Sequence, residues 1–255
     1  MRLTFNALKN RAKRFLLEVR EKLNVVYELD YPKHTIYLYD NVRIPSCYKE
    51  PDTVRWIEEF DKGDVVFDIG ANVGSFSLIM SLYSDRVYAI EPAFMNFELL
   101  CRNIALNVKK SRISNNICPL NIALGKETVL ETLNYTTFKL GNSGHQISGG
   151  KVFDPFFKQG ILCFSLDSLI GQFAIPSPNH IKIDVDGIEF TILKGGDRTL
   201  SNKNLKSVLV ETQSENERKI ISEYLQEKGL FLTGKFNIDP VGRQNESFNC
   251  VFKRK

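Results

Sequence analysis

Residues 65–75 read VVFDIGANVGS, a stretch that combines a short apolar run, a turn with two glycines and the start of a helix at Ser75. The run Val65–Phe67 predicts a buried strand, and Gly70 and Gly74 allow a sharp turn and a close approach of the backbone to a ligand. Further along the chain, apolar runs alternate with helical patterns, which is typical of parallel strands with crossover helices. Ligands of such sheets bind beyond the carboxyl ends of the strands, so this turn is a candidate binding site.

The spacing within the turn separates two classes of nucleotide. Asp68, Gly70 and Gly74 follow D-x-G-x-x-x-G, whereas dinucleotide binding requires G-x-G-x-x-G, so a diphosphate fits poorly. Glu91 comes 21 residues after Gly70 at the predicted end of the next strand, where its carboxylate can accept hydrogen bonds from ribose hydroxyls. Asp68 would attract the ammonium group of S-adenosylmethionine but repel a diphosphate. We therefore expect S-adenosylmethionine as the cofactor, and a nicotinamide-dependent oxidoreductase is the less favoured alternative.

Five segments of the sequence, taken in order, resemble the FkbM-type methyltransferases. They are residues 66–74 (VFDIGANVG), 88–92 (YAIEP), 121–125 (NIALG), 165–169 (SLDSL) and 181–189 (IKIDVDGIE). The likeness covers roughly residues 60 to 230. One departure is Asp186, where the family more often has glutamate, a change that keeps the charge but shortens the reach of the side chain.

This resemblance implies a fold and a reaction. The fold would be the Rossmann-like class I methyltransferase fold of the α/β class, a seven-stranded, mostly parallel sheet with helices on both faces and the last strand inserted antiparallel. The patterns at 230–236 and 248–252 themselves predict an antiparallel C-terminal hairpin. The reaction would be O-methylation of a hydroxyl on a sugar, glycan or natural product. A scaffold protein that keeps the fold without turnover is the alternative from another class.

The resemblance also implies which residues bind the cofactor. It assigns this role to Asp68, Gly70, Asn72, Gly74 and Glu91. We expect three further residues, in or next to the same segments, to line the same pocket: Ser75, Pro92 and Ala123.

Three residues are candidates for handling the methyl acceptor. Lys182 and Asp184 lie two positions apart in a predicted central strand and hence on one face of the sheet. They form either a structural ion pair under the site or a pair that positions or deprotonates the acceptor. His145 is the candidate general base, because it lies in a glycine-rich loop and imidazole titrates near neutral pH. We interpret His34 and His180 as structural.

A divalent cation is an alternative use of the acidic residues near the site. Asp184, Asp186 and Glu189, with Glu211 at the next strand end, could provide oxygen ligands. Glu189 could instead cap the following helix or hold the loop, since carboxylates are favoured near a helix N-terminus. The second explanation requires no metal, and we expect none.

The chain divides into three parts. Residues 1–24 predict a basic amphipathic helix, residues 25–62 a hairpin and helix that lead into the core, and residues 63–255 the methyltransferase domain, with a glycine-rich insertion at about 126–160. Seven basic residues and two glutamates give residues 1–23 a charge of +5, so the rest of the +4 chain carries −1. Such a nearly neutral body argues against a nucleic-acid partner.

The basic helix leaves two roles open. Residues 1–23 pack on the domain or on a second subunit of a homo-oligomer, or they dock peripherally on an anionic membrane surface. The sequence has no apolar run of about 18 residues to span a bilayer and no secretory signal pattern. The five cysteines are widely spaced without a C-x-x-C pair, so we expect them to be reduced. The expected location is the cytoplasm, with membrane association as the alternative.

Overall fold

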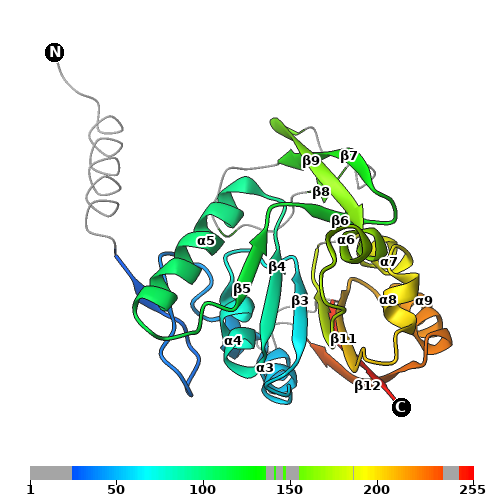
Figure 1. Ribbon diagram of the computed structural model, residues 1–255, viewed down its shortest axis with the longest axis horizontal. Coiled ribbons are helices and arrows are strands. Elements are labelled where there is room, and N and C mark those ends of the chain that lie inside the picture. The colour runs from blue at the N-terminus through cyan, green and yellow to red at the C-terminus, as the bar shows by residue number, and fades with distance from the viewer. Residues whose placement is uncertain (1–24, 136–140, 142–145, 148–154, 186, 238–246) are drawn as a thin grey trace.

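The computed structural model describes residues 25–135, 141, 146–147, 155–185, 187–237 and 247–255. Its centre is a seven-stranded sheet in the order β12-β13-β11-β10-β3-β4-β5 (Figure 1). Neighbouring strands are parallel except at β13, which is antiparallel to both β11 and β12. The predicted seven-stranded, mostly parallel sheet with an antiparallel C-terminal hairpin is confirmed.

The strands of this sheet are short, and helices connect most of them. The strands are β3 (Val65–Ile69), β4 (Arg86–Ile90), β5 (Ile117–Leu120), β10 (His180–Ile183), β11 (Ser207–Thr212), β12 (Leu230–Asn237) and β13 (Phe248–Arg254). The helices are α2 (Ser46–Lys49), α3 (Pro51–Glu58), α4 (Ser75–Tyr83), α5 (Phe94–Lys109), α6 (Leu166–Phe173), α7 (Glu189–Lys194), α8 (Asp197–Ser201) and α9 (Glu215–Glu227). The strand after residue 64 and the helix that begins at Ser75 lie where the sequence predicts them.

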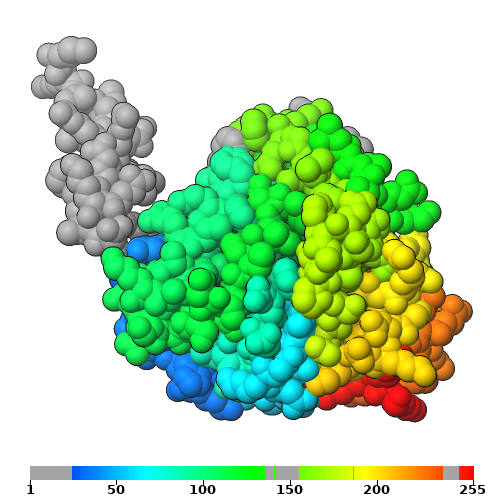
Figure 2. All heavy atoms as spheres, in the orientation of Figure 1, coloured from blue at the N-terminus to red at the C-terminus, as the bar shows by residue number. Residues whose placement is uncertain are grey.

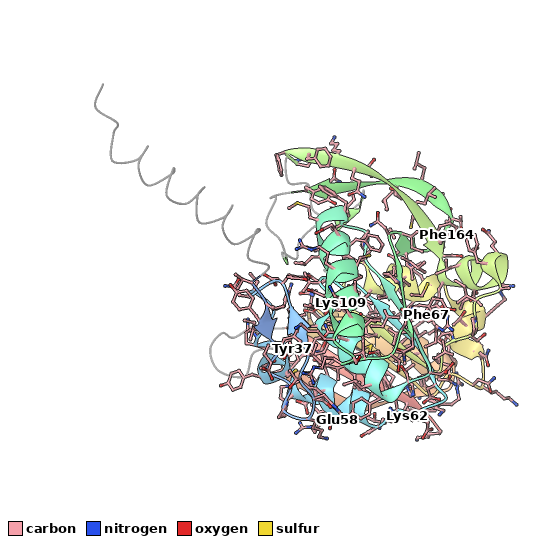
Figure 3. All side chains as sticks on the ribbon, turned by 60° about the vertical axis from the view of Figure 1, so that its left-hand side comes forward. Tyr37, Glu58, Lys62, Phe67, Lys109 and Phe164 are labelled. Atoms are coloured by element: carbon pink, nitrogen blue, oxygen red, sulfur yellow. The ribbon has the colours of Figure 1, made fainter. Side chains whose placement is uncertain are left out.

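Alternation of side chains along the strands produces two apolar layers. Val66 in β3 and Leu209 in β11 pack with α3, α4 and α5, whereas Phe67 and Val210 pack on the opposite face with α6 to α9. Figure 1 shows the two groups of helices on opposite sides of the sheet, and Figure 3 marks Phe67 near its centre. Each fully buried side chain of this size contributes about 1.5–3 kcal/mol to stability. Both layers are therefore needed to hold the sheet between its helices.

The helix before the C-terminal hairpin, α9, is capped at both ends. Ser214 Oγ accepts a hydrogen bond from the backbone N–H of Glu217 at 3.2 Å. Glu217 Oε2 accepts a hydrogen bond at 2.8 Å from the N–H of Gln213. In a standard capping box the donor would be the N–H of the N-cap residue, which here is Ser214. Gly229 follows the helix with φ of +80°, a conformation that costs glycine little.

Two apolar stretches of the sequence are each divided between two elements. Residues 117–125 form β5 and then β6 (Ala123–Gly125), which belong to different sheets. The chain turns between them at Asn121, whose amide donates to the backbone carbonyls of residues 91 and 92 at 2.8 and 3.0 Å. Residues 189–201 form α7 and α8, which are separated by two glycines. A Cβ at Gly195 would lie 2.1 Å from the Gly125 carbonyl oxygen, so this close approach requires glycine.

The described part of the glycine-rich insertion predicted at about 126–160 contains regular strands. A second sheet, in the order β6-β9-β7-β8, contains β7 (Val129–Tyr135), β8 (Gln146–Ile147) and β9 (Phe157–Ser165). Its inner face buries Leu133 and Ile161, while Leu130 and Leu162 lie exposed on the outer face. Figure 1 shows this sheet beyond one end of the main sheet, and in Figure 2 its green atoms adjoin those of α5.

A hairpin and two helices precede β3. β1 (Tyr27–Glu28) pairs antiparallel with β2 (Tyr37–Leu38), and α2 and α3 follow. Asn103 and Asn107 of α5 accept hydrogen bonds from the backbone N–H groups of Tyr39 and Tyr37, both at 2.9 Å, which fixes the hairpin on this helix (Figure 3). The helix predicted for residues 1–24 lies outside the described residues. None of the helices in the described part of the chain is long and apolar enough to cross a membrane.

A buried hydrogen-bonded relay joins α3 to the amino ends of β10 and β11. Trp56 Nε1 donates to Ser207 Oγ at 2.8 Å, and that hydroxyl lies 2.7 Å from His180 Nδ1. His180 Nε2 lies 2.8 Å from Asp64 Oδ2. The relay satisfies four buried polar groups at the end of the sheet opposite the glycine turn, which agrees with the structural interpretation of His180.

Candidate functional site

The turn between β3 and α4 has an unusual backbone. Gly70, Asn72 and Gly74 have φ values of +84°, +51° and +91°, all in the left-handed region. A Cβ at Gly70 would lie 1.8 Å from the backbone oxygen of Asp184, and one at Gly74 would lie 2.5 Å from Leu100. The two glycines are therefore required where the turn packs against the protein itself, whereas the sequence suggested that they admit a ligand.

Three polar atoms of this turn are buried and have no hydrogen-bond partner among the described residues. They are Asp68 Oδ1, Asn72 Oδ1 and Ser75 Oγ, and only one other such atom is found in the described part of the chain. Buried polar groups of folded proteins almost always have a hydrogen-bond partner. Three buried polar atoms without one, within eight residues, indicate a binding site for a polar ligand. The turn therefore fits a ligand that carries hydrogen-bond donors, as S-adenosylmethionine does.

Glu91 is buried at the end of β4 and faces this turn. Its Oε2 accepts a hydrogen bond from the Asn72 N–H at 2.8 Å, and its Oε1 accepts one from the Ala93 N–H at 2.9 Å. Burial raises the pKa of Glu91 to about 7, against the effect of these two hydrogen bonds. Because each carboxylate oxygen has two lone-pair sites, Glu91 can still accept hydrogen bonds from a ligand hydroxyl.

A buried ion pair lies beside the turn on the same face of the sheet. Lys182 and Asp68 are register partners in β10 and β3. The Nζ of Lys182 lies 2.7 Å from Asp184 Oδ2 and 3.9 Å from Asp68 Oδ1. The side chains of Lys182 and Asp68 are 2% and 1% exposed, whereas that of Asp184 is 29% exposed. Asp184 is thus the most exposed member of the cluster.

The charges of this cluster set its protonation. Burial alone would lower the pKa of Lys182, but the carboxylates of Asp184, Asp68 and Glu50 raise it, so the amine stays charged. Burial likewise opposes the ionisation of Asp184, yet the charge of Lys182 holds its pKa below the usual range of an aspartate. Burial raises the pKa of Asp68. The predicted pairing of Lys182 with Asp184 is confirmed.

Two residues of the site were missed in the sequence analysis. Glu50, between α2 and α3, accepts hydrogen bonds on Oε2 from Asn249 Nδ2 at 2.8 Å and from Thr53 Oγ1 at 3.0 Å. Asn249 pairs in register with Glu211, whose side chain lies close to that of Asp184. No motif surrounds Glu50 or Asn249, and 199 positions separate them, so only the folded chain reveals their contact.

The second sheet fixes the loop that follows Glu91. Gln159 of β9 donates from Nε2 to the carbonyl oxygen of Pro92 at 3.2 Å. The hydroxyl of Tyr135 in β7 donates to Gln159 and accepts from the Phe94 N–H at 3.1 Å. Ala123 is 1% exposed at the start of β6, where it belongs to the core of the second sheet.

The remaining candidates divide into two groups. His145, the predicted general base, and Asp186 lie outside the described residues. Glu189 accepts hydrogen bonds from the N–H groups of Gly187 and Val185, at 3.0 and 3.3 Å, so it holds the loop as one of the two explanations predicts. Among the described residues, no group of three or more histidine, cysteine, aspartate or glutamate side chains could hold a metal ion. The expectation of no metal stays a prediction.

A comparison with family models identifies the chain. The model of the Methyltransferase FkbM domain matches residues 68–230, which is more than half of the sequence. The chain belongs to this family. The matched range begins at Asp68 in the glycine turn and extends to the start of β12, so it includes the turn, Glu91 and the Lys182–Asp184 pair.

Individual relatives agree with the family. The chain is 28% identical over 190 residues to the hexuronic acid methyltransferase AglP of Haloferax volcanii, covering 74% of this chain and 72% of that protein. It is 25% identical over 227 residues to the methyltransferase sdnD of Sordaria araneosa, covering 77% and 82%. These likenesses confirm the prediction of a methyltransferase.

A solved structure of the same family shares the fold. This is the methyltransferase FkbM of Methylobacillus flagellatus, with a TM-score of 0.54 and 17% identity. The likeness covers 76% of this chain but only 44% of the solved one, so this chain spans less than half of that molecule. The class I methyltransferase fold implied by the sequence is confirmed.

Proposed function

We propose that this protein transfers the methyl group of S-adenosylmethionine to a hydroxyl of a sugar, glycan or related natural product. The observation that supports the proposal is the group of three buried atoms without a hydrogen bond, Asp68 Oδ1, Asn72 Oδ1 and Ser75 Oγ, in and beside the turn of a methyltransferase family member. The 28% identity to a hexuronic acid methyltransferase supports a uronic acid as the first acceptor to test.

Different residues in and beside the glycine turn bind different groups of S-adenosylmethionine. Asp68 provides a buried negative charge for the ammonium group, and Glu91 accepts from the ribose hydroxyls at the end of the next strand. The amide of Asn72 and the hydroxyl of Ser75 add hydrogen bonds, and Pro92 follows Glu91 at the edge of the pocket, whereas Ala123 lies in the core of the second sheet. S-adenosylmethionine supplies an activated methyl group whose departure from sulfur needs no acid.

On the acceptor side, Asp184 is ionised and partly exposed beside the turn. Lys182 keeps Asp184 in that state and is itself too deeply buried to meet an acceptor. Asp184 therefore holds the acceptor hydroxyl by a charge-assisted hydrogen bond, and Lys182 positions Asp184. The protein mainly aligns the hydroxyl oxygen with the methyl carbon, which can account for a large part of the rate.

Two measurements test this proposal. Asp68→Asn and Glu91→Gln, which keep the side-chain shape, should weaken S-adenosylhomocysteine binding by at least about tenfold in calorimetry, because charge-assisted hydrogen bonds contribute roughly 1.5–3 kcal/mol. Glu98→Gln, on the exposed side of α5, is the matched control and should bind as the wild type does. Unchanged binding in both site variants would contradict the assignment of Asp68 and Glu91 to the cofactor site.

The acceptor is tested separately with methyl-labelled S-adenosylmethionine. The wild type should label p-nitrophenyl glucuronide and give a methyl ether at a ring hydroxyl by mass spectrometry. Label on the carboxylate or on nitrogen would contradict O-methylation of a hydroxyl. Binding of S-adenosylhomocysteine without label in any sugar or in a cell extract would favour the scaffold alternative.

A further inference from the structure

Three exposed basic residues lie at the C-terminal end of α5. They are Lys109, Lys110 and Arg112, and we call them the basic face. No carboxylate in the described part of the chain forms an ion pair with any of them. The helix dipole favours a cation in the last turn, where Lys109 lies, but Arg112 follows after the helix has ended. Capping of α5 therefore does not account for the whole basic face.

Hydrogen bonds hold the basic face against the strand β2. The N–H of Tyr37 donates to Asn107 Oδ1 at 2.9 Å, and Asn107 Nδ2 donates to the carbonyl oxygen of Tyr37 at 2.7 Å. Beyond the helix, Ser111 has a φ of +54°, and the Arg112 N–H donates to the Asn107 carbonyl oxygen at 2.8 Å. The end of α5 and the strand thus form one fixed surface, on which Figure 3 marks Tyr37 and Lys109.

Two cations of the basic face share one aromatic ring. Lys110 Nζ and Arg112 Cζ lie 5.1 and 5.6 Å from the centroid of the Tyr37 ring. The ring attracts each cation, but two positive charges that are close to the same ring also repel each other. Glu28 pairs in register with Tyr37, and this one carboxylate offsets the charge of the three cations only in part. An anionic partner would complement the charge that remains.

The basic segment at residues 1–23 joins the domain beside this face. The first described strand, β1, begins at Tyr27, and its two residues pair with Leu38 and Tyr37 of β2. The segment that precedes this strand has a charge of +5. Packing of the segment on the basic face is opposed by their like charges, whereas an anionic surface attracts both. Of the two roles that the sequence leaves open, the structure of this region favours docking on such a surface.

The apolar residues of the same segment distinguish a bilayer from other anionic partners. At helical spacing they form a row that consists of Phe5, Leu8, Ala12, Phe15, Leu16, Val19 and Leu23. A nucleic acid would bind through the cations and leave this row in water. An anionic bilayer accommodates both, because the row can lie at the boundary between headgroups and acyl chains while the cations meet lipid phosphates.

We propose that residues 1–23 and the basic face together dock this protein on an anionic lipid bilayer. The proposal goes beyond the proposed function and does not depend on it, because binding to vesicles requires no methyl transfer. The predicted helix supplies the apolar contact, and the fixed cations of α5 supply a second attachment beside it. Since exposed charges are screened by salt, the attachment should weaken as the ionic strength rises.

The test is flotation of the full chain with vesicles of an equimolar mixture of phosphatidylcholine and phosphatidylglycerol. The wild type should float with these vesicles, should not float with phosphatidylcholine alone, and should be released by salt. Lys109→Gln/Lys110→Gln/Arg112→Gln should bind about 10- to 100-fold more weakly, because each basic residue near an anionic bilayer strengthens binding roughly fivefold. Its unfolding midpoint and its binding of S-adenosylhomocysteine should match the wild type, because all three side chains are exposed.

Two further variants complete the experiment. Lys194→Gln/Lys203→Gln/Lys219→Gln removes the same charge from exposed positions among the helices on the opposite side of the sheet, and should float as the wild type does. Phe15→Ser/Leu16→Ser keeps every charge but interrupts the apolar row, and should lose flotation.

Four results would overturn the inference. They are absence of wild-type flotation, equal flotation with neutral vesicles, wild-type flotation by the α5 variant, and tighter binding to a labelled DNA duplex that persists in Phe15→Ser/Leu16→Ser. A dimer that dissociates in Phe15→Ser/Leu16→Ser, in the absence of flotation, would identify a second subunit as the partner instead. Should the α5 variant fail to fold, Lys109→Glu replaces it, and unchanged flotation of that variant overturns the inference.

Discussion

The buried cation of the site gives the sharpest prediction about stability. Lys182→Met keeps most of the side-chain volume but removes the charge that lies 2.7 Å from Asp184 and 3.9 Å from Asp68. Removing one partner of a buried ion pair costs about 3–5 kcal/mol. Because water still reaches Asp184, which is 29% exposed, we expect the lower end, about 3 kcal/mol, or a fall of roughly 6–12 °C in Tm.

The pH dependence identifies the cause of that loss. The lowered pKa of Asp184 in the folded state stabilises the wild type above the ordinary aspartate value of 3.8, and this contribution disappears as the pH falls through the lowered value. The deficit of Lys182→Met, measured by urea unfolding, should therefore be largest near neutral pH and shrink on acidification. A double variant that combines Lys182→Met with Asp184→Asn should recover part of the lost stability. A loss under about 1 kcal/mol, or one that does not change with pH, would refute the reasoning.

Three further predictions follow from local geometry. Gly70→Ala should lower the free energy of unfolding by more than about 2 kcal/mol, because its Cβ would lie 1.8 Å from the Asp184 oxygen; denaturant unfolding checks this. S-adenosylhomocysteine affinity in calorimetry should rise with pH through about 7 as Glu91 ionises, and Glu91→Gln should abolish that rise. Burial lowers the pKa of His180, so the neutral imidazole contributes its full stability above the ordinary histidine pKa of 6.5, and this contribution is lost as the pH falls below that value. The His180→Gln variant should therefore lose less stability than the wild type as the pH falls below 6.5.

The main sheet could be predicted from the sequence because its signals are local. The apolar run of β3, the glycines of the turn and the capping residues Ser214 and Gly229 each act within a few positions. The second sheet could not be predicted in this way. Its paired strands β7 and β9 are separated by a glycine-rich stretch, and side-chain contacts between them, such as that of Tyr135 with Gln159, join residues 24 positions apart.

The candidate site was predictable only on the cofactor side. Asp68, near the end of one predicted strand, and Glu91, directly after the next, can both be recognised in a single sequence. Beside the turn, only Lys182 in β10 and Asp184, the residue directly after that strand, could be recognised from their spacing of two positions. Glu50 is held by Asn249 of β13, the last strand in the sequence, which pairs with β11 inside the sheet. No local sequence pattern predicts that this strand takes an inner position.

The hydrogen bond between Asn249 and Glu50 also has a consequence for biosynthesis. These residues are 199 positions apart, so during translation Glu50 leaves the ribosome long before the strand that anchors it has been made. Closing so large a loop is entropically costly, and contacts of this kind form slowly. A nascent or truncated chain that lacks 248–254 could already contain the glycine turn but would leave Glu50 without its anchor.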